Sequence, residues 1–375
     1  MGTPVDVEEL RSVGLAAGLA AVGVASVEPF LGTRQHLVER REQGLHGGMG
    51  FTYRNPVLST EPARLLRNAT SLVVGAYDYL RADVEPAEQP VGRVARYVWQ
   101  DHYDALAHGL RSVAERLRAA GWRSTVVADQ NHLVDREAAY RAGLGWYGKS
   151  SNLLLEGQGS WFILGSVVTD APLPPATPQA DGCASCRRCL DGCPTGAIVA
   201  PGVVDANRCL AWLVQAPGPF PRWARVALGD RIYGCDDCQE VCPPNQRRVR
   251  VETPAAPSDR ARPWVALVGL LAASNDELLD RFGRWYIAER DPRWLRRNAL
   301  VALGNVGQPA DPAVADAIAR SWQDPDPMLR AHAVWAAGQL GLAREALAAV
   351  AHDPAPEVRE EADELRRLLA HEAGA

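Results

Sequence analysis

The sequence predicts a mixed α and β protein of three consecutive parts: an α/β domain, a cysteine-rich module and a set of α-helical HEAT-like repeats. Residues 1–178 alternate between helical and strand-like hydrophobic patterns, which is typical of an α/β domain. Residues 179–250 contain all eight cysteines, and residues 251–375 carry repeated Asp-Pro segments followed by apolar helices. A proline-rich segment at 171–179 marks the first boundary.

The elements of the N-terminal part follow from hydrophobic spacing. A helix is predicted from Glu8 to Ala21, and an amphipathic helix is predicted over residues 104–120, where apolar residues recur every three or four positions. Short apolar runs predict buried strands at Ser71–Ala76, Ser124–Ala128 and Trp161–Thr169. These elements are sufficient to enclose a hydrophobic core of domain size.

The cysteines follow two related patterns, each closed by a proline. The first is C-x2-C-x2-C-x3-C-P, and the second is a single cysteine followed later by C-x2-C-x3-C-P. Disulfides or zinc could also use these cysteines, but the interleaved spacing favours a bacterial ferredoxin-like module with two [4Fe–4S] clusters. In such modules the fourth cysteine of a run binds the other cluster. The predicted ligands are Cys183, Cys186, Cys189 and Cys242 for the first cluster, and Cys193, Cys209, Cys235 and Cys238 for the second.

The C-terminal part starts its helices repeatedly with Asp-Pro, at Asp291, Asp326 and Asp353. The aspartate can cap the helix while the proline occupies its first turn. The repetition is typical of HEAT-type helical repeats. Such a surface can bind a macromolecule or simply pack against the rest of the protein, and the repeat alone favours neither interpretation.

The composition limits the cellular setting and the partners. The net charge is −5, so no overall basic field indicates nucleic-acid binding, and Lys149 is the only lysine. The apolar run Val13–Val27 is shorter than the roughly 20 residues of a membrane span, and the acidic N-terminus is unlike a signal peptide. The sequence therefore predicts a cytoplasmic protein with no membrane contact.

A second dense motif precedes the cysteines. Asp129 follows a predicted strand, and Ala142–Leu153 gathers glycines, two aromatic residues and the single lysine. Such glycines allow the backbone to approach a large flat ligand closely. An acid at the end of a strand is a frequent active-site position, but from the residues alone a turn or helix-capping role is favoured for Asp129.

Six motifs, taken in this order, resemble one enzyme family. They are His46–Met49, Ala95–Tyr97, Ala142–Asn152, Gly159–Phe162, Cys193–Ala197 and Tyr233–Gln239. The arrangement resembles the epoxyqueuosine reductases, which depend on cobalamin, carry two [4Fe–4S] clusters and are related to reductive dehalogenases. The resemblance covers nearly the whole chain and includes the helical repeats.

The resemblance implies an oxidoreductase that reduces epoxyqueuosine to queuosine at the wobble position of tRNA, with cob(I)alamin generated through the two clusters. Asp129 would be the catalytic proton donor, with a pKa raised by burial beside the corrin. The residues implied to contact cobalamin are Met49, Tyr97, Asp129, Lys149, Ser150, Asn152 and Leu153.

The loop after Asp129 departs from the family pattern. Gln130–His132 replaces the usual Thr-Ala-Pro, and Asp135 replaces the usual glutamate. These changes lie around the implied substrate pocket, where His132 is a candidate second proton donor. Two alternatives therefore stay open: a divergent, dehalogenase-like reductase of another small molecule, and a non-catalytic ferredoxin-type electron-transfer protein.

The expected partners are a tRNA anticodon stem-loop and an external low-potential electron donor, and the protein is expected to be a monomer. Two arginine groups suit contact with RNA phosphates, and aromatic residues in the second group suit base stacking. A solvated helix face would have the same composition. The arginines are Arg247, Arg248, Arg250, Arg260 and Arg262, then Arg281, Arg284, Arg290, Arg293, Arg296 and Arg297, with Trp285, Tyr286 and Trp294 in the second group.

Overall fold

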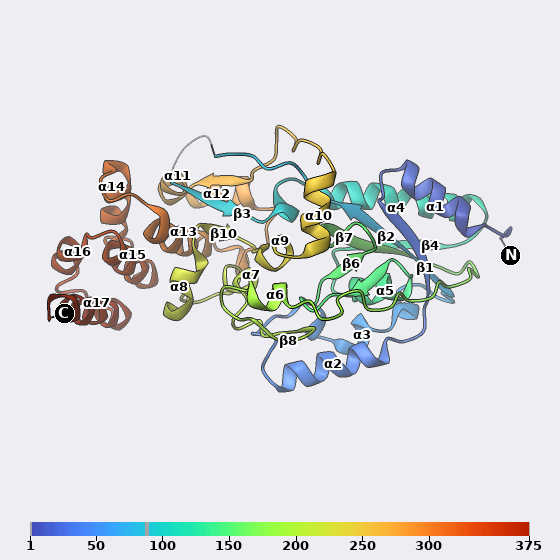
Figure 1. Ribbon diagram of the computed structural model, residues 1–375, viewed down its shortest axis with the longest axis horizontal. Coiled ribbons are helices and arrows are strands. Elements are labelled where there is room, and N and C mark those ends of the chain that lie inside the picture. The colour runs from blue at the N-terminus through green and yellow to red at the C-terminus, as the bar shows by residue number, and fades with distance from the viewer. Residues whose placement is uncertain (1, 87–89, 375) are drawn as a thin grey trace. The chain divides into compact units, whose positions relative to one another are not determined.

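The computed structural model describes residues 2–86 and 90–374, and these form two compact units, each assembled from separate stretches of chain (Figure 1). The first unit consists of the residues up to Ala82, Arg96–Cys209 and Asp236–Ala261. The second consists of Asp83–Ala95, Leu210–Cys235 and the residues from Arg262 onward. The three predicted domain ranges stay predictions, since these units group distant segments.

A four-stranded antiparallel sheet with the order β1-β2-β7-β4 organises the first unit (Figure 1). In β2, Ser71 lies opposite both Ser26 and Thr169, so this strand pairs along its length with two neighbours. The three predicted strands are confirmed, and β1 is an additional one. The strands are β1 (Ala21–Ser26), β2 (Ser71–Asp78), β4 (Ser124–Ala128) and β7 (Phe162–Thr169).

Helices cover both faces of this sheet, because successive side chains of a strand point to opposite sides. Val73 belongs to the core that includes α1 (Val7–Ala16) and α4 (His102–Ala119), whereas Val74 belongs to the core that includes α5 (Asp135–Arg141). Both valines are fully buried. The amphipathic helix predicted over residues 104–120 is confirmed as α4.

The predicted N-terminal helix ends earlier than expected. It stops at Ala16, and Gly18 follows with a φ of 92°, a left-handed conformation that glycine adopts at little cost and that ends a helix. The assignment of helix up to Ala21 is therefore wrong, and that residue begins β1. The run of small apolar residues fits both a helix and a buried strand, so its spacing could not separate them.

The remaining elements of the first unit are short and lie between the sheet strands and in the cysteine-bearing segments. The helices are α2 (Leu31–Glu42), α3 (Pro56–Ser59), α6 (Arg188–Asp191), α9 (Asp237–Glu240) and α10 (Pro243–Val251). Single 3₁₀ turns lie at Phe51–Tyr53, Pro62–Leu65 and Arg96–Val98. Two small hairpins pair β5 (Gly145–Tyr147) with β6 (Leu153–Leu155), and β8 (Ile198–Ala200) with β9 (Val203–Val204).

The second unit joins a three-stranded sheet to a helical array. The sheet has the order β10-β3-β11, formed by β10 (Arg231–Tyr233), β3 (Val91–Val94) and β11 (Trp264–Ala266). The helices α13, α15 and α17 pack in succession, as expected for stacked repeats. Of the helices in the described ranges, none combines the length and the hydropathy that crossing a bilayer would require. The helices are α7 (Leu210–Leu213), α8 (Arg222–Leu228), α11 (Leu267–Ala272), α12 (Asn275–Phe282), α13 (Arg293–Val306), α14 (Pro312–Ser321), α15 (Pro327–Gln339), α16 (Ala343–Ala349) and α17 (Pro356–Gly374), with a 3₁₀ turn at Ala288–Arg290.

The predicted start of a helix at Asp-Pro, with the aspartate as cap and the proline in the first turn, is confirmed at Asp326, whereas the prolines at 292 and 354 lie before α13 and α17. The Asp326 carboxylate accepts a hydrogen bond from the backbone N–H of Met328 at 2.9 Å, and Pro327 is the first residue of α15. Asp353 accepts the equivalent bond from Ala355 at 2.9 Å, although α17 begins only at Pro356. Each aspartate thus satisfies an N–H group that has no partner inside the helix.

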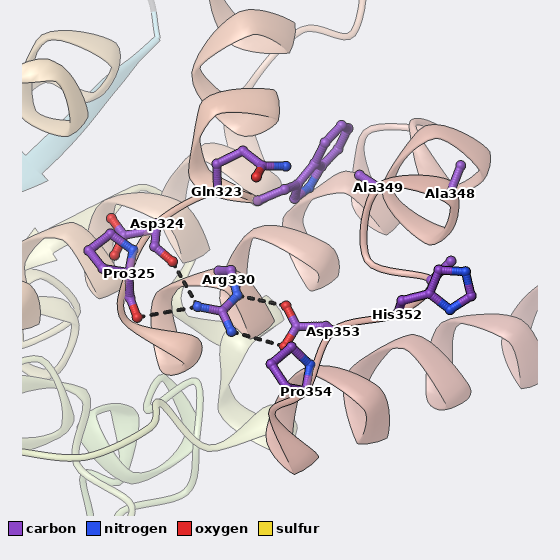
Figure 2. Close-up of a pocket in the computed structure, with 11 residues that line it drawn as sticks. Gln323, Asp324, Pro325, Arg330, Ala348, Ala349, His352, Asp353 and Pro354 are labelled. Carbon is purple, nitrogen blue, oxygen red and sulfur yellow. Dashed lines mark hydrogen bonds and ion pairs between the residues drawn. The ribbon is translucent and has the colours of Figure 1, made fainter.

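Arginine–aspartate pairs tie successive repeats together. Arg293 lies 3.3 Å from Asp326, and Arg330 donates two hydrogen bonds of 2.7 and 2.9 Å to Asp353. Figure 2 shows the second pair at a cavity of about 430 Å³, and Arg330 donates there to the carbonyl oxygen of Asp324 as well. The arginine is thus committed to holding the repeats together, and none of the predicted site residues lines this cavity.

Candidate functional site

Asp129 directly follows β4 and begins the loop that leads to α5. Its backbone adopts a φ of 53°, in the left-handed region that residues other than glycine rarely occupy, so the loop holds it in a strained conformation. Asp129 and the three residues that follow it, Gln130–His132, are exposed. The loop therefore presents a carboxyl group to solvent beside an edge strand of the sheet.

Two carboxyl groups on this loop have raised pKa values. Although Asp129 is exposed as a residue, partial burial of its carboxyl group raises its pKa, in the predicted direction. Asp135, the first residue of α5, has a buried Oδ1 atom without a hydrogen-bond partner in the described part of the chain. Burial, together with the negative charge of Asp129, raises the pKa of Asp135 to about 8. Asp135 therefore keeps its proton near neutral pH.

Four cysteines converge in the first unit. Burial, followed by the thiolate charges of Cys183, Cys189 and Cys186, raises the pKa of the Cys242 thiol to about 11. Burial, with the charges of Cys183 and Cys186, also raises the pKa of Cys189. All eight cysteines are half-buried, and none of them forms a disulfide. Four converging thiols have the chemistry that a [4Fe–4S] cluster requires, while the assignment of individual ligands stays a prediction.

The other four cysteines, Cys193, Cys209, Cys235 and Cys238, come from three stretches of the chain. Cys193 Sγ accepts a hydrogen bond of 3.2 Å from the backbone N–H four residues further on. Cys238 lies in α9, and its Sγ accepts a hydrogen bond of 3.9 Å from the side-chain amide of Asn152. Cys209 precedes α7, and Cys235 follows β10. Amide donors directed at sulfur suit cysteines that bind a cluster, because such bonds stabilise the charge on the sulfurs.

The turn between β5 and β6 carries three of the residues implied for cobalamin, and a fourth begins β6. Lys149 Nζ donates to the carbonyl oxygens of Ala184 and Cys186 at 2.6 and 2.9 Å. Ser150 is half-buried, and Leu153 is buried within β6. The side-chain hydrogen bonds of Lys149 and Asn152 thus run to the cysteine-bearing segments. Contact of these residues with cobalamin stays a prediction.

The two remaining implied contacts lie elsewhere in the first unit. Met49 follows α2, and its backbone N–H donates to the carbonyl oxygen of His46 at 3.0 Å. Tyr97 lies in a 3₁₀ turn and packs against the core that includes α4. Both residues are half-buried, so each retains some accessible surface for a ligand.

A buried hydrogen-bond network anchors α9 and α10 to the end of the sheet. The Gln239 side-chain oxygen accepts hydrogen bonds from Tyr79 Oη at 3.2 Å and from Ser160 Oγ at 2.9 Å. Asn245 donates to Ser160 Oγ and accepts from the Ser160 backbone N–H at 2.7 Å. All four side chains are buried. The network therefore fixes the second cysteine run against the strands of the first unit.

Sequence reasoning missed this network. Gly159 is part of its cause: its φ is 75°, and a Cβ atom there would lie 1.9 Å from Asn245 Oδ1. The only available signal was the position of polar residues inside and directly after a cysteine run, at Gln239 and Asn245. Nothing in local spacing shows that such residues are buried.

The arginine groups include members with structural roles. Arg248 is buried and pairs with Asp78 and with Glu252. Arg297 is buried and donates to three backbone carbonyl oxygens in the segment 213–218, and burial lowers its pKa to about 9. The expectation that these two arginines contact RNA is therefore wrong, because their guanidinium groups are enclosed by protein.

Other members of these groups remain at the surface. In the second unit Arg281 and Arg284 are exposed, and the Tyr286 side chain is 45% exposed with its ring stacked on Trp212. The tryptophans at 285 and 294 are buried instead. In the first unit the exposed members are Arg247, Arg250 and Arg260.

Two known families match parts of the chain. A family described as "4Fe-4S double cluster binding domain" matches residues 182–245, and "HEAT repeats" matches residues 284–366. The first match includes all eight cysteines, which confirms the prediction of two [4Fe–4S] clusters. The second confirms the helical repeats.

Three relatives that match about 90% of this chain are all epoxyqueuosine reductases. The chain is 34% identical over 349 residues to an epoxyqueuosine reductase of Bacillus anthracis, covering 90% of each chain. The enzyme of Xanthomonas campestris is 35% identical and covers 89% of this chain and 96% of its own. The enzyme of Escherichia coli is 33% identical and covers 90% of this chain and 92% of its own.

Solved structures agree in fold. An epoxyqueuosine reductase crystallised with an epoxyqueuosine-modified tRNA-Tyr stem loop superposes with a TM-score of 0.85 at 30% identity, covering 97% of this chain and 98% of its own. The enzyme of Bacillus subtilis, with the loop of its catalytic aspartate swung out of the active site, gives 0.84 at 30% identity over 96% of this chain and 98% of its own. The predicted mixed fold class is thereby confirmed.

Proposed function

The chain belongs to the epoxyqueuosine reductase family, and we propose that it reduces epoxyqueuosine to queuosine at the wobble position of tRNA. The observation that carries this proposal is the match over 90% of this chain and 90% of the Bacillus anthracis relative, which extends far beyond the cysteine module. Members of this family are oxidoreductases, and their cofactors are two [4Fe–4S] clusters and cobalamin.

In this proposal Asp129 donates the proton that lets the epoxide oxygen leave. Its raised pKa supports the role, because a general acid must hold its proton near the working pH. Its exposed, strained loop is suited to move, as the corresponding loop does in the Bacillus subtilis relative. Loss of the epoxide oxygen as water consumes two electrons and two protons, and the protonated Asp135 keeps a second proton nearby.

The cofactors would be held by the residues assigned above. Cobalamin, when bound, supplies the reducing chemistry at the carbon–oxygen bond, with electrons delivered through the clusters. The convergence of four thiols supports the first ligand set, and the N–H donors at Cys193 and Cys238 support two members of the second. The residues proposed to line cobalamin are Met49, Tyr97, Asp129, Lys149, Ser150, Asn152 and Leu153.

The proposed partner is the anticodon stem-loop of a tRNA. In the second unit the exposed Arg281 and Arg284 precede the exposed ring of Tyr286, a combination suited to phosphate contact and base stacking. The proposal also includes an external low-potential electron donor, a monomeric protein and a cytoplasmic location. A measurement of mass in solution tests the monomer independently of activity.

Anaerobic turnover of an epoxyqueuosine-bearing tRNA stem-loop tests the proposed function. Protein loaded with clusters and cobalamin should convert the nucleoside to queuosine, read by mass spectrometry as the loss of one oxygen atom. Asp316, an exposed acid in α14, provides the matched control: Asp316→Asn should retain turnover whereas Asp129→Asn should not. Loaded wild-type protein that leaves the nucleoside unchanged would contradict the proposal and favour a different small-molecule substrate.

A further inference from the structure

The turn Gly148–Asn152 between β5 and β6 contacts two of the cysteine loops. Two backbone hydrogen bonds close it, from Gly148 N to Asn152 O at 2.8 Å and from Ser151 N to Gly148 O at 2.9 Å. Ser151 has a φ of 65°, so the turn has a specific left-handed step. Side chains that project from this turn are therefore held in defined positions.

Lys149 reaches the first cysteine loop. Its ammonium group donates to the carbonyl oxygens of Ala184 and Cys186, at 2.6 and 2.9 Å. Ala184 has a φ of 43°, so the ammonium group supports a strained turn between two predicted ligands of the first cluster. In the described part of the chain no carboxylate lies within ion-pair distance of Lys149. Its full positive charge therefore acts on the cysteine loop without neutralisation.

Asn152 reaches the other cysteine group. Its side-chain amide donates to Cys238 Sγ at 3.9 Å, a distance at which sulfur still accepts a hydrogen bond. Cys238 is a predicted ligand of the second cluster. One short turn thus directs a cation at the surroundings of the first cluster and an N–H donor at a ligand of the second.

A third attachment keeps the turn in place. Ser151 Oγ donates to the carbonyl oxygen of Gly202 at 2.8 Å, and Gly202 N donates to the carbonyl oxygen of Lys149 at 2.9 Å. Arg40 donates to the same Gly202 oxygen at 2.8 Å. The turn is therefore bound to three separate segments, and its two polar side chains do not depend on one contact for their placement.

Positive charges and N–H donors near an iron–sulfur cluster stabilise its reduced form, because reduction adds negative charge that spreads over the sulfurs. We propose that the turn 148–152 sets the reduction potentials of both clusters: Lys149 raises the potential of the first, and Asn152 raises that of the second. This rests on the cluster part of the proposed function and does not depend on the substrate. The two potentials together determine which cluster holds an electron on its way from the donor to cobalamin.

Potentiometric measurements on the full-length protein, followed by electron paramagnetic resonance of each reduced cluster, test the proposal. Lys149→Gln should lower the equilibrium constant for reduction of the first cluster about tenfold, which corresponds to a potential lower by about 59 mV for a one-electron couple. Lys149→Arg keeps the positive charge and should restore most of the lost potential. Asn152→Leu should lower the potential of the other cluster by a smaller amount, about threefold in the equilibrium constant. Arg40→Gln is the matched control. It also removes one positive charge, but Arg40 donates to the carbonyl oxygen of Gly202, which the turn contacts through Ser151, and not to a cysteine loop.

Iron and sulfide contents accompany each measurement. Fully loaded Lys149→Gln and Asn152→Leu proteins with wild-type potentials would overturn the proposal. So would loss of iron from Lys149→Gln with full iron in Lys149→Arg, because the lysine would then hold the loop rather than set the potential. The measurement uses neither cobalamin nor RNA, so a failure of the proposed reaction leaves its outcome unaffected.

Discussion

Two loops of the first unit flank α5 and β5, and they differ in how firmly they are held. The loop after Asp129 is exposed over Gln130–His132, and no hydrogen bond of these three side chains lies within the described residues. The turn 148–152 is closed by two backbone bonds and attached to three neighbouring segments. The first loop is thus held by few hydrogen bonds, whereas the second is held by many.

The difference matches the two kinds of chemistry expected of them. A proton donor that meets a large substrate benefits from a loop that can open and close. Electron transfer instead requires groups whose positions and charges stay constant, because a cluster potential depends on its fixed surroundings. Both segments are irregular in secondary structure. They differ in how many hydrogen bonds hold them, and this difference corresponds to the different chemistry proposed for each.

The largest expected effect is on the exposed loop that begins at Asp129. Asp129→Asn keeps the size of the side chain but cannot donate a carboxyl proton, so kcat should fall about 10³-fold, within the usual range for a general acid. Single-turnover measurements of queuosine formation check this. Cluster content should be unchanged, because the residue touches no cysteine loop. A decrease smaller than tenfold would remove Asp129 from the role of proton donor.

The second effect is on the pH dependence of stability. The pKa of Asp135 is raised to about 8, so between pH 4 and 8 the folded protein binds more protons at this site than the unfolded chain does. Stability therefore falls as the pH rises through this window. Asp135→Asn removes this dependence, and the variant should become more stable than wild type by roughly 5 kcal/mol at pH 8, since each unit of raised pKa corresponds to about 1.4 kcal/mol.

Thermal unfolding of both proteins between pH 4 and 9 checks this prediction. The difference between the two midpoints should be smallest near pH 4 and should widen until about pH 8. Asp129→Asn provides a second test. The charge of Asp129 contributes to the raised pKa of Asp135, so without it the fall in stability should end at a lower pH. A constant difference between the midpoints across the range would show that the acid is not protonated in the folded state.

The third prediction compares the stability effects of two asparagines, the buried Asn245 and Asn131 in the exposed loop. Asn245 is 1% exposed and bonds Ser160 by both its amide nitrogen and its oxygen. Asn245→Ala leaves the Ser160 N–H buried without a partner, which should cost about 2 kcal/mol of unfolding free energy. Asn131→Ala, in the exposed loop, should change stability by less than about 0.5 kcal/mol. Equal losses in the two variants, measured by denaturant unfolding, would contradict the comparison.

The same contrast explains what the sequence could predict. The cysteine spacing carries its information locally, so the two clusters were predictable from the residues. Strands such as Ser124–Ala128 were also predictable, because β-branched runs between polar residues are local signals. The burial of Gln239 and Asn245, and the reach of Lys149 to the first cysteine loop, depend on segments brought together from distant parts of the chain. No local pattern encodes such contacts, and the early end of α1 was hidden by small residues that suit helix and strand equally.

The smallest expected effect concerns His132, a candidate second proton donor in the exposed loop. The residue is exposed, and its side chain has no hydrogen-bond partner in the described part of the chain, so nothing holds the imidazole in a position for proton transfer. Its place beside Asp135, which already retains a proton near neutral pH, makes a further donor unnecessary. His132→Ala should therefore lower kcat less than about threefold, and the pH–rate profile from pH 5.5 to 8 should keep its shape. A tenfold loss that is greatest at low pH and shrinks as the pH rises would instead show that the loop closes over the substrate and that the imidazole supplies a proton there.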